Sequence, residues 1–344
     1  MKTMNQTKGM VPRIAVTGAT GELGGRVAAR LAKLGIAQRL VVRDPKRAPQ
    51  LPGTEVVQAS SYGDAAGMGR ALAGVETLFL VSAHDVMNFA QRSTTGVVGS
   101  YDRVKQQTTA VDAAAAVGVQ RIVYLSFVNA SPDATFILAR EHFHTEEHIR
   151  ETGVSFTFLR MTLYMDLVPL HVSILKPGKV GGVIRGPAGL GRAAWVARDD
   201  LADVAVAVLT GAGHDGHTYD VTGPEALTME ETAKQLSDVT GRRIIYEAQT
   251  PHEARALRTT SGLYEFEATR RARTGVSFTE YEVEEWVTHF MQIATGEMGT
   301  VSDMVPKLTG HEAQTLTDFL RKHPKSYSDK PWYTGSSIEG YDYR

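Results

Sequence analysis

The stretch I-A-V-T-G-A-T-G-E-L-G-G, residues 14–25, joins a short apolar run to the start of an amphipathic pattern. Within it, Gly18, Gly21 and Gly24 have the G-x-x-G-x-x-G spacing of a strand-to-helix turn that holds a dinucleotide. Gly18 permits the tight turn, Gly21 lets the backbone approach a pyrophosphate, and Gly24 allows close packing of the helix on the strand. The first N–H groups of the helix are then donors to the phosphates, the alternative being a turn that binds nothing. The residues expected at the cofactor here are Gly18, Thr20, Gly21, Glu22, Leu23 and Gly24.

Outward from this turn, short β-branched runs alternate with longer helical patterns, which predicts βαβ units and a parallel sheet. Runs such as T-L-F-L-V-S, residues 77–82, are almost continuously apolar, as central parallel strands are. We therefore predict an α/β fold: a Rossmann doubly wound parallel sheet with a smaller, mainly helical C-terminal substrate region. Strands are expected at 13–17, 39–42, 55–59, 77–82, 121–126 and 155–160, and helices at 22–34, 64–73, 100–117 and 138–151.

The chain is expected to divide into four parts. Residues 1–12 are predicted to be a disordered leader without the apolar stretch of a secretory signal, and 13–160 to be the NAD(P)-binding Rossmann domain. Residues 161–323 are predicted to be a substrate-binding region interleaved with the sheet, and 324–344 a tail.

Beyond residue 160 the pattern is less regular. Prolines and glycines predict an irregular segment over 163–198, with 178–191 at the rim of a pocket. Asp199 or Asp200 is expected to cap a helix that runs to about residue 209, and Thr228 with Glu231 to form a capping box. Further helices are expected at about 228–241, 251–260, 280–295 and 311–323.

The composition excludes several kinds of function. The 344 residues include 37 basic and 38 acidic side chains, a formal net charge of −1, and no cysteine. A neutral chain is unlike a nucleic-acid binder, and no apolar run reaches the roughly 18 residues of a membrane span. The absence of cysteine excludes disulfides and thiolate chemistry and is compatible with a cytoplasmic location. We expect a small-molecule partner, no nucleic acid and no membrane, with the C-terminal helices either capping the pocket or building a homodimer.

The end of the second predicted strand carries a group of basic residues. It reads V-V-R-D-P-K-R, residues 41–47, about twenty residues after the glycine turn. At this place an acidic residue would hold the ribose of NAD, and an arginine the 2′-phosphate of NADP. Asp44 precedes a proline and either caps the turn or faces the ribose, whereas Arg39, Arg43, Lys46 and Arg47 are basic. We predict NADP(H) in preference to NAD(H), with Arg43 and Lys46 at the phosphate; a solvated surface turn is the alternative.

With these features the chain resembles the NmrA-like branch of the atypical short-chain dehydrogenases/reductases. The resemblance implies a Rossmann fold, bound NADP(H), and a likeness to NADPH-dependent quinone reductases and triphenylmethane-dye reductases. The branch also contains regulators that bind NADP(H), so the alternative function is a non-catalytic NADP(H)-sensing protein that acts through a protein partner. The residues that carry the resemblance are 14–25, V-V-R-D-P-K-R-A (41–48), L-A-G-V-E-T-L-F-L-V-S (72–82), R-I-V-Y-L-S (121–126) and T-E-E-H-I-R-E-T-G-V-S-F-T-F-L-R (145–160).

The proton relay typical of short-chain dehydrogenases is missing. Its Tyr-x-x-x-Lys pair corresponds to Leu138 and His142 here. Hydride transfer without a relay favours a quinone-like or conjugated acceptor, whose reduced product is intrinsically stable. His142 is expected to point toward the cofactor ribose or the substrate, or else to be a buried structural histidine. In the family, residues 161–165 run beside the nicotinamide, which makes Tyr164 a candidate for ring stacking or proton donation.

The pocket should lie at the carboxyl ends of the strands. His144 and His148 lack the H-E-x-x-H pattern and share a stripe with Glu141 and Glu151 that we expect to be solvated, so no metal site is predicted. The further candidates at the cofactor are Val81, Ser82, Ser126, Phe127 and His142, and those at the substrate are His84, Phe136, Met161, Tyr164 and Met165.

Overall fold

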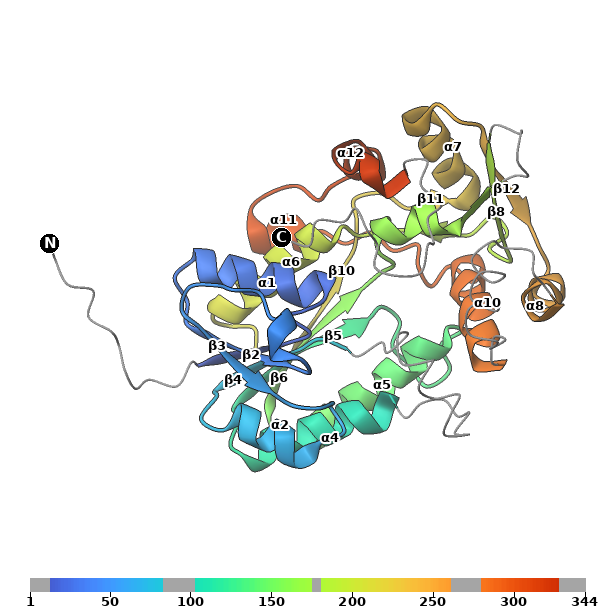
Figure 1. The fold of residues 1–344 in the computed structure, drawn as a ribbon. Helices are drawn as coiled ribbons and strands as arrows, with labels where there is room; N and C mark the ends of the chain where they lie inside the picture. The colour runs from blue at the N-terminus through green and yellow to red at the C-terminus, as the bar shows by residue number, and fades with distance from the viewer. Residues whose placement is uncertain (1–12, 83–102, 175–180, 261–279, 328–344) are drawn as a thin grey trace, which may run out of the picture.

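A seven-stranded parallel sheet organises the chain, in the order β10-β6-β5-β4-β1-β2-β3 (Figure 1). The computed structural model describes residues 13–82, 103–174, 181–260 and 280–327. The strand order reverses between β1 and β4, which is where an open α/β sheet binds its ligand. The predicted Rossmann fold is therefore confirmed. The strands are β1 (Ile14–Thr17), β2 (Gln38–Val42), β3 (Thr54–Gln58), β4 (Thr77–Leu80), β5 (Arg121–Phe127), β6 (Ser155–Met161) and β10 (His217–Val221).

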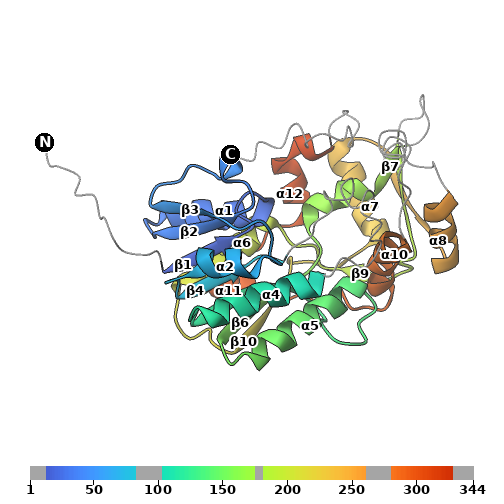
Figure 2. The same ribbon diagram turned by 60° about the horizontal axis from the view of Figure 1, so that its bottom comes forward.

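Helices cover both faces of this sheet (Figure 2). On one face α1 (Glu22–Lys33) packs beside α6 (Arg198–Thr210), which contacts α11 (Met304–Thr309); on the other, α2 (Ala65–Leu72), α4 (Arg103–Ala116) and α5 (Ile137–Glu151) lie side by side. Successive residues of β5 point to opposite cores: Val123 packs with the α1 side and Tyr124 with the α4 side. Burial on both faces explains why the central strands are apolar throughout.

The start of α6 differs from the prediction. Ala197 precedes this helix and carries no capping side chain, so the cap expected from Asp199 or Asp200 is wrong. Asp199 instead accepts a hydrogen bond from Arg30 of α1 at 2.9 Å, and Asp200 accepts one from the backbone N–H of Gln314 at 2.8 Å. Both carboxylates are used to join α6 to other elements.

A smaller lobe lies beyond the sheet and contains short strands that the sequence did not indicate. β8 (Gly182–Gly186) pairs with β7 (Val172–Ile174) and β12 (Ile244–Ala248), and β9 (Arg192–Ala193) pairs with β11 (Leu227–Thr228). The irregular segment expected at 163–198 thus contains the 3-10 helix η3 (Met165–His171) and three strands, and the region expected to be a pocket rim contains β8.

The helices of this lobe largely agree with the prediction. The capping box of Thr228 and Glu231 is present, and Gly241 ends the helix at a φ of 69°. The predicted domain boundary at residue 160 and the predicted homodimer stay predictions. The helices are α7 (Met229–Thr240), α8 (Pro251–Thr260), α10 (Glu280–Ala294) and α12 (Leu316–Lys322), with the short 3-10 helix η4 (Pro324–Tyr327); a further 3-10 helix, η1 (Pro45–Arg47), follows β2 in the main sheet.

Two hydrophobic cores meet at the carboxyl edge of the sheet. One fills the space between the sheet and α1 with α6, and the other fills the smaller lobe. Met161, the last residue of β6, packs against both cores. No helix in the described ranges is both long and apolar enough to span a bilayer.

The close contact of α1 with β1 gives a first testable prediction. A Cβ at Gly24 would lie 2.7 Å from the carbonyl oxygen of Thr17 and would overlap that of Gly18. We expect Gly24→Ala to lower the free energy of unfolding by about 2 kcal/mol, because backbone must move to admit the methyl group. Urea denaturation measures the change.

Gly69→Ala in α2 is the matched control. Its Cβ would meet only the side chain of Val117, at 3.7 Å. This variant should gain about 0.5–1 kcal/mol from the better helix propensity of alanine. Equal stability of the Gly24→Ala protein and the wild type would contradict the close approach of Gly24 to the backbone of Thr17 and Gly18.

Candidate functional site

The glycine turn has the geometry of a phosphate cradle. Gly18 has a φ of +64°, and its carbonyl oxygen accepts the N–H of Gly21 at 2.9 Å. Gly21 is exposed and precedes α1, and no described side chain caps the first turn of this helix. The backbone N–H groups at its start are therefore available to an anion. Leu23 is buried in the core, so only its backbone can face the cofactor, while Thr20 and Glu22 are half-buried.

A hydroxyl group fastens this turn to the neighbouring strand. The Thr17 hydroxyl donates to the carbonyl of Phe79 at 3.1 Å and accepts the N–H of Val81 at 2.9 Å. Tyr62 donates to the Val81 carbonyl at 2.8 Å, and burial raises the pKa of Tyr62 to about 12. Val81 and the following Ser82 are half-buried beside the glycine turn. The switch point is therefore held by residues that the sequence did not single out.

The basic turn after β2 is exposed, but one of its expected members lies elsewhere. Arg43, Lys46 and Arg47 are exposed, and Asp44 accepts the N–H of Lys46 at 3.0 Å, so this aspartate caps the turn. Arg39 is only 6% exposed. It donates to the carbonyls of residues 71 and 73 at 2.9 Å and pairs with the carboxylate of residue 55, so counting it among the phosphate-side cations was wrong.

A directed chain of hydrogen bonds holds His142. Arg103 Nη2 lies 2.8 Å from His142 Nε2, and an arginine only donates, so this nitrogen is the acceptor. The proton of the neutral ring is then on Nδ1, which donates to the Tyr124 hydroxyl at 2.8 Å. Tyr124 donates to Gln107 Oε1 at 3.2 Å, and Gln107 Nε2 donates to the Thr145 hydroxyl at 3.1 Å. Both ring nitrogens of the 2%-exposed His142 have protein partners, which favours the alternative of a buried structural histidine, while its contact with ribose or substrate stays a prediction.

Arg103 also contacts the stripe of α5 that was expected to be solvated. Glu141 lies 3.4 Å from Arg103 Nη1 and accepts the Tyr281 hydroxyl at 2.6 Å, so this stripe is partly covered by α10. Glu285 of α10 belongs to the same group of charges. Burial raises the pKa of Glu285 to about 7, while Arg103 lowers it.

Ser126 is hydrogen-bonded to a buried glutamate that forms an ion pair with Arg160. Its hydroxyl donates to Glu146 Oε1 at 2.5 Å, and Arg160 donates to the two carboxylate oxygens of Glu146 at 2.9 and 2.6 Å. Glu146 is fully buried, and Ser126 stands opposite Arg160 in the register of β5 with β6. The hydroxyl proton of Ser126 is thus already used, which leaves only its lone pairs for the predicted contact with the nicotinamide.

Aromatic rings connect β5 to the smaller lobe. The Phe127 ring lies 5.3 Å from that of Phe136 and stacks on His142 at 6.1 Å between ring centres. Phe136 in turn meets His289 of α10 edge to face. Met165 is fully buried in the core of the smaller lobe, and its contact with substrate stays a prediction. Phe136 is 3% exposed.

Tyr164 lies at the junction of the two cores. It follows β6, its backbone bridges to Val196, and its half-buried ring packs against the core that contains Ala19 of the glycine turn. The Arg198 guanidinium lies over this ring, 3.9 Å from its centre, and pairs with the carboxylate of Asp166.

The structure thus brings together most of the predicted residues. The glycine turn, Val81, Phe127, His142, Met161 and Tyr164 lie along the carboxyl edge of β1, β4, β5 and β6. His84 lies outside the described residues. Arg103 and Arg198 were not predicted from the sequence. For Arg198 a usable signal existed, because a basic residue in the first turn of a helix opposes the helix dipole.

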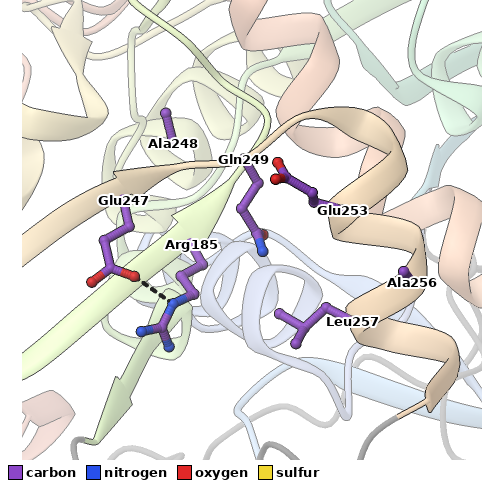
Figure 3. Close-up of a pocket in the computed structure, with 7 residues that line it drawn as sticks. All are labelled: Arg185, Glu247, Ala248, Gln249, Glu253, Ala256 and Leu257. Carbon is purple, nitrogen blue, oxygen red and sulfur yellow. Dashed lines mark hydrogen bonds and ion pairs between the residues drawn. The ribbon is translucent and has the colours of Figure 1, made fainter.

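A separate open pocket lies in the smaller lobe, between β8, β12 and α8 (Figure 3). Its volume is about 410 Å³, and Arg185 and Glu247 form an ion pair of 2.6 Å in its wall. None of the predicted site residues lines it.

Known proteins are similar to this chain in both sequence and fold. A family model described as the NmrA-like family matches residues 10–284. A (4-alkanoyl-5-oxo-2,5-dihydrofuran-3-yl)methyl phosphate reductase of Streptomyces griseus is 32% identical over 92% of this chain and 99% of its own length.

Two solved structures are similar over nearly their whole length. The NADPH-dependent quinone oxidoreductase of Escherichia coli in complex with NADPH is 28% identical and superposes with a TM-score of 0.71, covering 90% of this chain and 99% of that one. The triphenylmethane reductase of Citrobacter sp. in complex with NADP(H) is also 28% identical, with a TM-score of 0.68 and the same coverage.

The buried pair of Glu146 and Arg160 provides the test for this part of the molecule. We expect Glu146→Ala to lower the free energy of unfolding by about 3 kcal/mol, because Arg160 loses its carboxylate partner in the interior. Urea denaturation followed by far-UV circular dichroism measures the loss.

The neighbouring Glu147 is the control. It is 46% exposed at its side chain and pairs only at the surface with Arg150. Glu147→Ala should change stability by no more than about 0.5 kcal/mol. Similar losses in the two variants would show that the interior pair has no special role.

Proposed function

The chain belongs to the NmrA-like family, and from this premise we propose that it passes a hydride from NADPH to a quinone-like or conjugated small molecule without a tyrosine–lysine relay. The protein is an NAD(P)H-dependent reductase, as its named relatives are. NADPH supplies the hydride when it is bound. The protein residues hold the cofactor and align the acceptor.

The observation that carries the proposal is the combination of an intact cradle with a missing relay. The glycine turn leaves its backbone donors open, and Arg43 stands exposed at the end of β2, where a 2′-phosphate would lie. Leucine occupies position 138, and both ring nitrogens of His142 are held by protein partners. An acceptor whose reduced form is stable as an anion needs no proton from these positions.

The names of the relatives support the same class of acceptor. The Streptomyces griseus relative is named for a 5-oxo-2,5-dihydrofuran that carries an alkanoyl group, a ring whose C=C bond is conjugated to carbonyl groups. Such a bond accepts a hydride at carbon, as a quinone does. We therefore include activated enones with quinones in the proposed acceptor class.

A panel of acceptors tests the proposal. Purified protein with NADPH is expected to reduce at least one quinone or activated enone and to leave simple ketones unreduced, because hydride addition to a simple ketone leaves an alkoxide that no conjugation stabilises. NADPH oxidation followed by absorbance, with product identification, measures this. Tight NADP⁺ binding without oxidation by any acceptor would support the NADP(H)-sensing alternative instead.

The choice of cofactor has its own test. Arg43→Ala should weaken NADPH binding by about tenfold or more and NADH binding hardly at all, since only NADPH carries the 2′-phosphate. Isothermal titration with each nucleotide measures the ratio of affinities. Arg39→Ala is the control: it removes a buried structural arginine and should lower stability while leaving the ratio unchanged. Equal losses for both nucleotides in Arg43→Ala would contradict the placement of Arg43.

A further inference from the structure

The junction of the two cores brings a tyrosine together with an arginine from a distant part of the chain, and a second arginine is held by α5. Tyr164 follows β6, Arg198 begins α6 and Arg103 begins α4. Tyr164 and Arg198 meet because the backbone of Tyr164 bridges to Val196, two residues before Arg198, while Arg103 is held by His142 of α5. Neither arginine follows from the tyrosine–lysine pattern of the family.

Arg198 is fixed over the tyrosine by its own partner. Its guanidinium lies 3.9 Å from the ring centre, and its charge is paired with Asp166, two residues after Tyr164. The side chains of Arg198 and Asp166 are only 16% and 17% exposed. Because the pair is largely shielded from water, the cation acts on the ring through little solvent.

Arg103 is the second cation. His142 Nε2 and Glu141 Oε2 hold its guanidinium at 2.8 and 3.4 Å, and its side chain is 10% exposed. His142 occupies the position of the missing lysine. The histidine therefore does not replace that lysine as a cation but holds another cation in place.

The electrostatics of the tyrosine agree with this arrangement. Burial raises the pKa of Tyr164, whereas Arg198 and Arg103 both lower it. Because burial dominates, the phenol keeps its proton through neutral pH. The two cations lower the free energy needed to form the phenolate of Tyr164. Lysine has the same effect on tyrosine in the usual relay.

We propose that Tyr164, with Arg198 over its ring and Arg103 as a second cation, forms a relocated tyrosine–cation relay that supplies the proton in reductions of activated enones. Asp166 and His142 are positioning residues that hold the two arginines. The inference rests on the proposed reductase function and adds the proton donor and the class of acceptor that needs it.

The proposed reduction of an enone consists of a hydride transfer followed by a proton transfer. The hydride leaves the dihydronicotinamide with its electron pair and forms a C–H bond at the β-carbon of the enone, and the C=C pair moves into an enolate. The O–H bond of Tyr164 breaks, its proton goes to the enolate, and the phenolate is stabilised by the arginines. Water returns a proton to the phenolate. A quinone gives a hydroquinone anion that is stable in water, so its reduction does not need this step.

Kinetics on two acceptors test the proposal. We expect Tyr164→Phe to lower kcat/KM for an activated enone by about 100-fold or more, and for a quinone by about threefold at most. Arg198→Met should show the same selectivity to a smaller degree, and Arg198→Lys should recover part of the enone activity. Binding of NADP⁺ to each variant, measured by isothermal titration, should remain within about threefold of the wild type, since the tyrosine acts on the acceptor.

A titration without acceptor provides a second readout. Tyr164 is replaced by 3-fluorotyrosine, a more acidic phenol, and its pKa is followed by ¹⁹F NMR. Arg198→Met and Arg103→Met should each raise this pKa, because each removes a positive charge. Arg140→Met is the control: this α5 arginine donates to the carbonyl of Ala134 and should leave the pKa unchanged.

The outcomes separate the two proposals. If the wild type oxidises NADPH with neither acceptor, the proposed function fails, and the titration alone decides whether the arginines act on Tyr164. If both acceptors are reduced and Tyr164→Phe affects them equally, or if the pKa does not move in either arginine variant, the relocated relay is wrong. Selective loss of enone reduction with a raised pKa supports it.

Discussion

The close approach of α1 to β1 and β4 is the constraint on which the rest of the structure depends. Gly18 takes a left-handed conformation against Val81, and Gly24 lies where any Cβ would strike the backbone of the preceding turn. The Thr17 hydroxyl joins the same two strands from inside. Because side chains are excluded here, the helix begins directly above the strand ends with open backbone donors, and the other site residues are arranged around that point.

Local features of the sequence predicted this half of the molecule well. Six parallel strands and four helices follow from apolar runs, the glycine turn and the glycines that end helices, all of which act over a few residues. β8 could not be predicted in the same way, because it is five residues long and finds its partners at residues 172–174 and 244–248. Its glycines suggested irregularity, but the ring of Phe290 fills the space beside Gly186.

The candidate site shows a similar limit. Backbone roles, such as those of the glycine turn, were predictable because they depend on residue type and spacing alone. Side-chain roles were not, because they depend on partners far away in the sequence. Arg39 lies in β2 and Arg43 directly after it, four residues on, yet Arg39 caps the end of α2 and Arg43 is exposed. His142 was singled out correctly as an inward residue, but its contacts became visible only with Arg103 and Tyr124 in place.

The order of donors around His142 bears on how such a site changes during evolution. Arg103 can only donate, so residue 142 must present an acceptor to it. A lysine at position 142 would set an ammonium group against the guanidinium, with like charges in a poorly hydrated interior. A tyrosine–lysine relay at 138 and 142 would therefore also need a replacement at 103, so that the new ammonium group does not face the guanidinium. The contact between Arg103 and His142 thus makes the residue type at one position depend on the residue type at the other, which is epistasis between two helices.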